Sequence, residues 1–458
     1  MTEAELSYLD LDVGPVAHGG HCLARTAAGQ VVFVRHALPG ERVRAIVTEE
    51  RRGYLRADAV EVLAAAPGRV EPPCPWARPG MCGGCDFQHA SLDLQRELKA
   101  AVVREQLTRI GGLSEAEVAA LRVQVVGLPD VPGEPPGFGW RTRVRYTVDT
   151  DGRAGLLKHR SHEVVPIDWC RIAHPAVRSA TVDGEGVLER SWPDHAAVEV
   201  IASGTGAPAS GGQRIEVTVL GVLARDPFTA SGVKRGPLHV EEHALGRTWR
   251  LPAQAFWQVH PAAAQTLANC VVELLDPRPG ERVWDLYGGV GLFAAALAPH
   301  VASGGESPGR VTVVESDPDA AGAAESCLAD LPDVAVVRAR VERALTARLT
   351  GGRPPGGRPS GGRRGRARSG PGPAGLEAAV DLVVLDPPRA GAGRAVVEQI
   401  VLRRPRAVAY VACDPAALAR DVRSFREAGW RLAVLRGFDL FPQTHHVECV
   451  ALLMPAQS

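Results

Sequence analysis

A carboxylate follows a short apolar run in the last quarter of the chain. Residues 382–385 are all apolar, Asp386 comes next, and Pro387 and Pro388 follow it. An unbroken apolar run is typical of a strand buried on both faces of a parallel sheet, and two prolines prevent both strand pairing and helix formation. Ligands bind at the carboxyl ends of strands in open α/β sheets. The pattern therefore predicts a ligand-binding carboxylate at Asp386, with a purely structural proline turn as the alternative.

Three cysteines near residue 80 could bind a soft metal. Cys74, Cys82 and Cys85 lie within twelve residues, and Gly83 and Gly84 allow the backbone to approach a metal closely. Four thiolates hold either zinc or an iron–sulfur cluster. Cys170 is the best candidate for a distant fourth ligand, unless it is an ordinary buried cysteine. The spacing alone does not separate a [4Fe-4S] cluster from zinc.

A glycine-rich turn predicts a nucleotide site further along the chain. The apolar run 283–286 is followed by Tyr287-Gly288-Gly289-Val290-Gly291, and a second run, 311–315, ends in Glu315. A strand, a glycine turn and a helix bring the backbone close to a nucleotide, and an acid at the end of the next strand can bind ribose hydroxyls. NAD and S-adenosylmethionine both carry that ribose, so the turn does not choose between them.

The elements needed to position these residues indicate a multidomain α/β protein of 458 residues. Short β-like runs between glycine turns predict a small OB-like β-barrel in residues 1–65. We expect residues 66–248 to form a central α+β domain with the cysteine cluster, including an amphipathic helix at 91–110. We expect residues 249–458 to form a Rossmann-like domain, interrupted at 351–375 by a Gly/Pro/Arg-rich segment that should be a disordered loop.

Composition excludes some classes of function. The 52 basic and 52 acidic residues balance, so no global field attracts a polyanion. No apolar run reaches the 18 residues of a membrane span, and the acidic N-terminus lacks the features of a signal peptide, so we expect a cytoplasmic protein. Arginines alternate in residues 140–146, which predicts either a phosphate-binding strand face or a solvated edge strand.

The ordered motifs resemble those of the S-adenosylmethionine-dependent RNA (uracil-C5)-methyltransferases, specifically the group that carries a TRAM domain and makes 5-methyluridine in rRNA or tRNA. Gly19-Gly20, Phe33-Val34 and Pro39-Gly40-Glu41 resemble the TRAM domain, an RNA-binding barrel. The catalytic domain is matched by Asp386-Pro-Pro-Arg389, Ala412-Cys413-Asp414-Pro415, Phe441-Pro442 and His446-Val447-Glu448. The resemblance implies a class I methyltransferase fold for the C-terminal domain.

The resemblance also assigns roles to residues. Cys413 is the expected nucleophile and Glu448 the expected general base. The positions that match the family's donor contacts are Gln258, Tyr287, Glu315 and Asp386. The expected ligands of a structural [4Fe-4S] cluster, with zinc as the second choice, are Cys74, Cys82, Cys85 and Cys170. The expected partner is RNA, rRNA rather than tRNA, with a flipped or loop uridine.

Two other functions remain open from the sequence. Adenine-N6 methyltransferases share the fold and an Asp-Pro-Pro motif, but they need an aromatic residue after the prolines, where this chain has Arg389. A non-catalytic iron–sulfur RNA-binding protein is the other alternative, and Cys413 together with Glu448 argues against it.

Overall fold

The computed structural model describes residues 7–182, 191–206, 215–223, 230–302, 309–346, 376 and 379–456. The chain divides into two units. The first comprises Met1–Thr266, Cys413–Ala416 and Arg436–Cys449, and the second comprises Leu267–Ala412, Ala417–Leu435 and Val450–Ser458. The three contiguous domains expected from the sequence stay a prediction, and the segment 351–375 lies outside the described residues.

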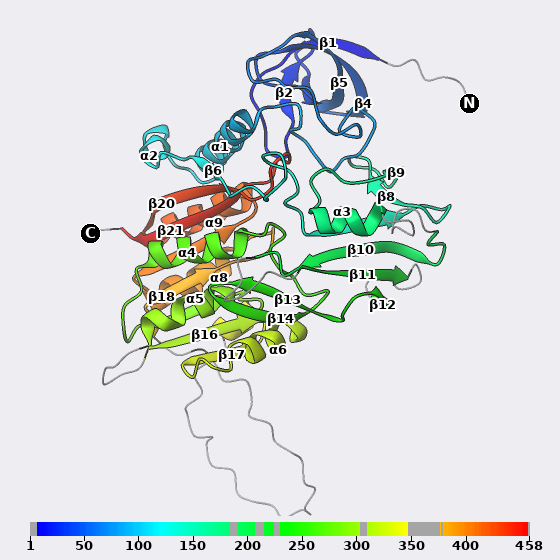
Figure 1. Ribbon diagram of the computed structural model, residues 1–458. Helices are drawn as coiled ribbons and strands as arrows, with labels where there is room; N and C mark the ends of the chain where they lie inside the picture. Colours follow the sequence, from blue (N-terminus) through cyan, green and yellow to red (C-terminus); the bar gives the residue numbers. More distant parts are fainter. Residues whose placement is uncertain are drawn as a thin grey trace, which may run out of the picture. The chain divides into compact units, whose positions relative to one another are not determined.

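The first unit begins with a five-stranded sheet in the order β1-β4-β5-β3-β2, drawn in blue in Figure 1. Alternation of apolar and polar residues along these strands turns one face inward, where Val32, Val34 and Val43 are fully buried. The predicted N-terminal barrel is confirmed. Its strands are β1 (Tyr8–Asp12), β2 (Cys22–Arg25), β3 (Val31–Arg35), β4 (Arg42–Arg51) and β5 (Tyr54–Ala64).

Two capped helices follow the barrel. The predicted helix at 91–110 is α1 (Leu92–Arg109), and the Ser91 hydroxyl accepts from the Leu94 amide at its start. The shorter α2 (Glu115–Ala120) begins with a capping box of Ser114 and Glu117. Beyond it, β6 (Val125–Gly127) pairs in parallel with the last residues of β20 (Trp430–Asp439), which return to the first unit.

A second sheet of the first unit has the order β12-β11-β10-β7-β8-β9. The expectation of an edge strand at residues 140–146 is wrong, because β7 lies between β10 and β8, and the phosphate-binding face stays a prediction. The Arg143 guanidinium donates to Glu242 at 2.8 Å and to the Ala255 carbonyl at 2.6 Å, so it stabilises the interior. The remaining elements of this region are β7 (Arg143–Val148), β8 (Ala154–Leu157), β9 (Val164–Pro166), α3 (Pro175–Val182), β10 (His195–Ser203), β11 (Glu216–Leu223), β12 (Ala230–Arg235) and the hairpin β13 (His239–Ala244) and β14 (Arg247–Pro252).

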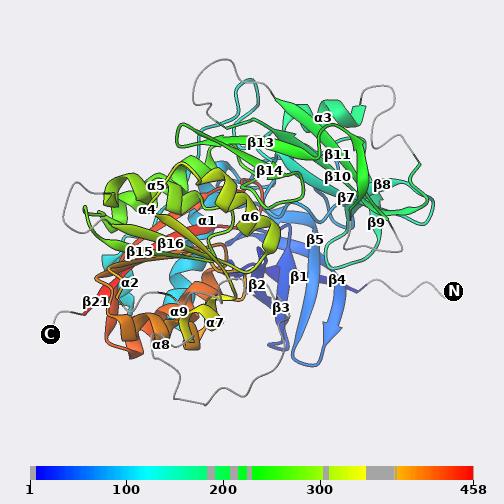
Figure 2. The same cartoon turned by 90° about the horizontal axis from the view of Figure 1, so that it is seen from below.

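The second unit is built on a sheet in the order β17-β16-β15-β18-β19-β21-β20. Figure 2 shows α5 on one face of this sheet and α8 and α9 on the other. The run Leu382–Leu385 is β18, fully buried and paired in parallel with Val283–Leu286. The elements are α4 (Ala263–Leu275), which begins in the first unit, β15 (Arg282–Leu286), α5 (Leu292–Val301), β16 (Arg310–Glu315), α6 (Pro318–Cys327), β17 (Val334–Arg338), α7 (Val341–Thr346), β18, α8 (Arg394–Arg403), β19 (Ala407–Ala412), α9 (Pro415–Glu427) and β21 (Glu448–Pro455).

This strand order places a topological switch between β15 and β18. From β15 the chain runs outward through β16 to β17, and it then returns to β18 on the other side of β15. Ligands of doubly wound sheets bind at the carboxyl ends of strands beside such a switch. The fold class predicted from the sequence is confirmed. Among the described residues, no helix combines the length and apolar character needed to cross a bilayer.

Candidate active site

The glycine turn after β15 uses left-handed backbone conformations and leaves no room for a side chain at Gly288 or Gly291. Tyr287 has a φ of 61°, and Gly291 has a φ of 85°. A Cβ added to Gly288 would lie 2.6 Å from Cγ1 of Val313, and one added to Gly291 would collide with Leu328. The backbone is therefore packed tightly against its neighbours where α5 begins. The Tyr287 side chain is half-buried.

Three carboxylates occupy the carboxyl ends of adjacent strands in the second unit. Glu315, at the end of β16, accepts the Gly289 amide at 3.0 Å and the Asp317 amide at 2.7 Å. Asp285 on β15 is fully buried, and its Oδ2 accepts the Ala294 amide at 2.9 Å. Its Oδ1 has no hydrogen-bond partner in the part of the chain that the structure describes. The sequence predicted Glu315 here but did not single out Asp285.

These carboxylates influence one another electrostatically. Burial raises the pKa of Asp285 to about 7, and the charge of Glu315 adds to that effect. Burial likewise raises the pKa of Asp386 to about 7, with Asp285 as the nearby negative charge. The sheet edge therefore collects acidic groups that favour cations and hydroxyl donors as ligands. The structure brings Asp386 and Glu315 to this edge, as the sequence predicted.

An aspartate on α9 holds the loop that follows Asp386. The Asp421 carboxylate accepts the Ala392 amide at 2.7 Å, the Gly393 amide at 3.1 Å and the Tyr410 hydroxyl at 2.6 Å. A Cβ added to Gly391 would lie 2.7 Å from Asp421 Oδ2, so the loop passes directly over this carboxylate. The sequence analysis missed Asp421, since no local pattern marks it.

Cys413 and Glu448 lie in the first unit. Cys413 is half-buried directly after β19, and Glu448 is the buried first residue of β21. Burial raises the pKa of the neighbouring Cys449 thiol, and the nearby Glu448, Asp414 and Cys413 raise it further, in that order. The residues predicted to act as base and nucleophile therefore both act electrostatically on Cys449, and they belong to the ends of neighbouring strands. Their chemical roles remain predictions.

Two further contacts lie within the first unit. The ring of His18, from the barrel, lies 3.1 Å from Asp414 Oδ2, directly beside Cys413. Gln258, the fourth predicted donor contact, also belongs to the first unit. It is half-buried, and the next residue, Val259, accepts both the Thr142 amide at 2.9 Å and the Thr142 hydroxyl at 3.0 Å. The backbone at Gln258 is thus anchored to the strand region around β7.

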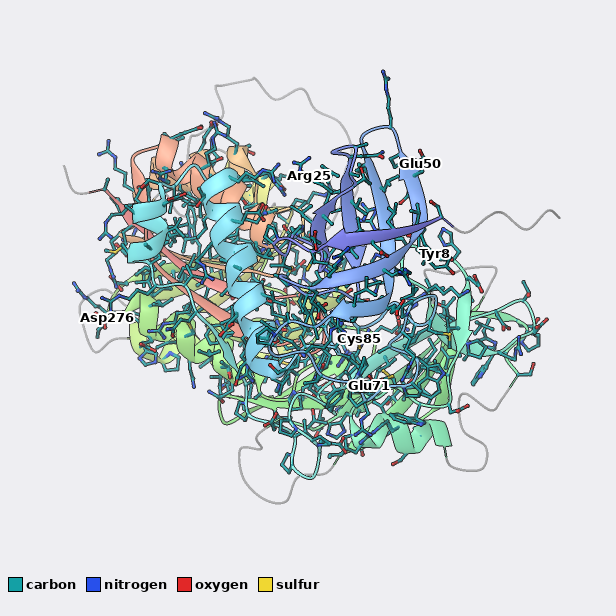
Figure 3. The ribbon with its side chains drawn as sticks, turned by 90° about the horizontal axis from the view of Figure 1, so that it is seen from above. Tyr8, Arg25, Glu50, Glu71, Cys85 and Asp276 are labelled. Atoms are coloured by element: carbon teal, nitrogen blue, oxygen red, sulfur yellow. The ribbon has the colours of Figure 1, made fainter. Side chains whose placement is uncertain are left out.

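The four cysteines expected to bind a metal line one cavity of the first unit. Cys85 is labelled in Figure 3. The cavity wall also contains Trp76, Leu156, Ile167 and Trp169, which make it largely apolar. Within the described residues, no group of three or more histidines, cysteines or acidic residues has the arrangement of a site for a metal ion. The four cysteines thus share one cavity, and both their role as ligands and the identity of any metal group stay predictions.

Known proteins resemble this chain along its whole length. Residues 5–60 match the TRAM domain family, and residues 376–456 match the family described as tRNA (Uracil-5-)-methyltransferase. An uncharacterized RNA methyltransferase of Streptomyces avermitilis is 47% identical, with 98% of each chain covered. The 23S rRNA (uracil(1939)-C(5))-methyltransferase RlmD of Chromohalobacter salexigens is 31% identical, with 97% of this chain and 88% of the relative covered.

A solved structure shares the fold. The tRNA (uracil-54, C5)-methyltransferase of Pyrococcus abyssi, in complex with S-adenosyl-L-homocysteine, aligns with a TM-score of 0.64 and 20% identity. The alignment covers 97% of this chain and 99% of the other. Relatives that are 47% and 31% identical over nearly the whole chain, together with the two family matches, establish the relationship. The chain belongs to the TRAM-bearing RNA (uracil-5-)-methyltransferases.

Proposed function

We propose that this enzyme transfers a methyl group from S-adenosylmethionine to C5 of one uridine in 23S rRNA, through a covalent bond between Cys413 and C6 of the base. The observation that carries the proposal is that Cys413 directly follows β19 and Glu448 begins β21, and these two strands are neighbours in the sheet. A nucleophile and a base are the two groups that the reaction needs, and they come from two separate strand ends.

The chemistry explains the need for both groups. C5 of uracil is a weak nucleophile, and addition of the Cys413 thiolate to C6 makes it an enolate carbon. That carbon forms a bond to the donor's methyl group, and the sulfonium sulfur keeps the electron pair of the broken bond. Glu448 then removes the proton from C5, the C5–C6 double bond re-forms, and the thiolate leaves. The reaction requires no oxidant or reductant.

The methyl donor is expected to bind at the acidic sheet edge of the second unit. Glu315 accepts the ribose hydroxyls, and Tyr287 lies against the donor from the glycine turn. Asp386 is the third proposed contact at that edge, and Gln258 stays a prediction from the family resemblance. The fit is supported by the fold shared with a protein crystallised with S-adenosyl-L-homocysteine and by the tight glycine turn at Gly288.

We also propose that the cavity lined by the four cysteines holds an iron–sulfur cluster. Its four thiols can supply the four ligands of a [4Fe-4S] cluster, and its apolar wall can exclude water. We propose a structural cluster, because no step of the methyl transfer uses electrons. Anaerobically purified protein should absorb light at about 400 nm and contain about four iron atoms per chain. Colourless protein with one zinc per chain would exclude the cluster.

The substrate is proposed to be rRNA because a relative aligned over nearly the whole chain is named as a 23S rRNA enzyme. The target uridine must leave its stack, or lie in a loop, for C6 to reach the thiol. The test is to incubate the enzyme with labelled donor and either a 23S rRNA fragment or tRNA, and then to map 5-methyluridine. RNA containing 5-fluorouridine should become covalently linked to the enzyme, but not to the Cys413→Ala variant. Methylation of tRNA alone would exclude rRNA, and absence of the link would exclude the covalent route.

A further inference from the structure

Residues 440–447 form the loop between β20 and β21 and lead directly into Glu448. Residues that follow the cysteine cluster hold this loop. The amides of Asp86 and Phe87 both donate to the Gln443 carbonyl, at 2.9 and 3.0 Å. Asp86 is the residue directly after Cys85, which lines the thiol cavity. One peptide bond therefore joins the wall of that cavity to the support of this loop.

The Asp86 side chain makes a second connection to the same loop. Its Oδ2 accepts the backbone amide of His445 at 3.1 Å and lies 2.6 Å from Nδ1 of the His445 ring. An ionised carboxylate can accept hydrogen bonds but cannot donate them, so Nδ1 of His445 is the donor in that contact. Asp86 is buried, and Arg35 lies 3.7 Å from its other oxygen. The buried Asp86 carboxylate therefore accepts two hydrogen bonds from His445, one from the backbone and one from the ring, and it holds both in place.

The remainder of the loop is fixed from α1. The Gln95 amide group exchanges two hydrogen bonds with Gln443, at 2.8 and 3.0 Å. Gln443 has a φ of 72°, a left-handed conformation that a residue other than glycine keeps only when its neighbours enforce it. Gly20 closes the other side, because a Cβ there would lie 2.7 Å from Cβ of His445. Strain at Gln443 and this close approach show that the loop is held in one shape.

From these contacts we infer that Asp86 is a positioning residue for Glu448, acting through His445. With His445 bonded to Asp86 and Val447 buried, the backbone that leads into Glu448 is anchored on both sides of His446. A base acts efficiently only when it lies within hydrogen-bond reach of its proton. Loosening the loop should therefore slow removal of the C5 proton more than the earlier addition and methyl transfer. This inference rests on the proposed covalent mechanism.

The experiment measures how much enzyme is trapped on RNA. Each variant is mixed with S-adenosylmethionine and a uridine-containing 23S rRNA fragment, and the covalent complex is quantified on a denaturing gel. Glu448→Gln should trap most of the enzyme, because the methylated adduct cannot lose its proton. Asp86→Asn and His445→Ala should raise the trapped fraction at least about tenfold over the unmodified enzyme, since a positioned base contributes about 100-fold or more. The matched control is Asp93→Asn, which should trap no more than the unmodified enzyme. Asp93 is an exposed acid on α1 that bonds only Arg96 among the described contacts.

The outcomes separate this inference from the proposed function. Trapping in Glu448→Gln, with none in Asp86→Asn or His445→Ala, overturns the inference alone. A rise in the KM for RNA in His445→Ala with an unchanged trapped fraction also overturns it, because His445 is then an RNA contact. Absence of trapping in Glu448→Gln overturns the covalent mechanism itself.

A second measurement needs neither RNA nor donor. Amide hydrogen exchange of residues 441–448 should be at least about tenfold faster in Asp86→Asn and in His445→Ala than in Asp93→Asn, because local opening becomes easier. His445→Ala removes only a partly exposed ring, so it keeps the test valid if Asp86→Asn fails to fold. Unchanged exchange in both variants would contradict the role of Asp86.

Discussion

The acidic sheet edge of the second unit and the loop that carries Glu448 in the first unit are held in different ways. At the sheet edge, Asp285, Glu315 and Asp386 follow directly from strand register and a short glycine turn. In the loop, contacts join residues 340 to 359 positions apart, such as Lys99 with Asp439 and Asp86 with His445. The first site is determined by local sequence, and the second depends on assembly of the whole first unit.

The largest expected effect tests whether the two sites act separately. Cys413→Ala should lower methyl transfer at least about 10⁴-fold, because removing a nucleophile eliminates the covalent route. The affinity for S-adenosylmethionine should change less than about twofold, since the donor's proposed contacts lie elsewhere. A methyl-transfer assay and titration calorimetry measure the two quantities. Cys327→Ala, a half-buried cysteine outside both sites, is the control. A parallel loss of donor affinity would show that the sites are not separable.

The second prediction tests the dependence of the loop on distant contacts. Lys99 and Asp439 are both fully buried, and Lys99 Nζ lies 2.5 Å from Oδ1 of Asp439 and 3.0 Å from the Phe441 carbonyl. Lys99→Met should lower the free energy of unfolding by about 3–5 kcal/mol, because it leaves a buried carboxylate without its closest cation.

Lys158 provides a matched control for this change. Its ion pair with Glu163 has the same 2.5 Å separation but is partly exposed. Lys158→Met should therefore cost less than about 1 kcal/mol. Urea unfolding of both variants measures the difference. Equal costs would mean that burial of the Lys99 pair contributes nothing to the support of the loop.

The same contrast explains how far the sequence could predict this protein. The run 382–385 matches β18, and 283–286 matches β15 within one residue, because apolar runs and proline stops are local signals. The four cysteines that line one cavity of the first unit could be grouped from spacing and residue type. The roles of Asp86, Lys99 and Asp421 could not, since each depends on a partner that only the folded chain brings near. Arg143 was misjudged for the same reason, as its acceptors lie about a hundred positions away.

The third prediction concerns the pH dependence of the sheet edge. Burial raises the pKa of Asp285 from 3.8 to about 7. As pH rises, the unfolded chain loses this proton first, so the unfolded state binds fewer protons than the folded state between about pH 4 and pH 7. The contribution of Asp285 to stability is therefore lost across that window and stays constant above it.

Asp285→Asn should remove this dependence. The difference in unfolding free energy between the variant and the unmodified protein should grow in favour of the variant from pH 4 to pH 7, to about 2–4 kcal/mol. Asparagine keeps an oxygen to accept the Ala294 amide. Urea unfolding at several pH values measures the difference, and Asp319→Asn on the exposed face of α6 should give a flat one. A flat curve for Asp285→Asn would mean that this carboxylate ionises normally in the folded protein.

The smallest expected effect concerns the donor's ribose. Glu315→Gln keeps the side-chain length but replaces two carboxylate acceptors with one amide oxygen and one donor. Hydrogen bonds to charged groups contribute about 1.5–3 kcal/mol, so donor affinity should fall roughly tenfold to a hundredfold, while turnover at saturating donor should stay within about threefold. Calorimetry and steady-state kinetics separate the two quantities. Glu325→Gln, whose carboxylate pairs with Arg338 on the same unit, should leave both unchanged. Glu315 also accepts the Gly289 amide. A fall in turnover equal to the fall in donor affinity would therefore mean that Glu315 acts by shaping the glycine turn. The sheet edge would then depend on supporting contacts, as the loop at residues 440–447 does.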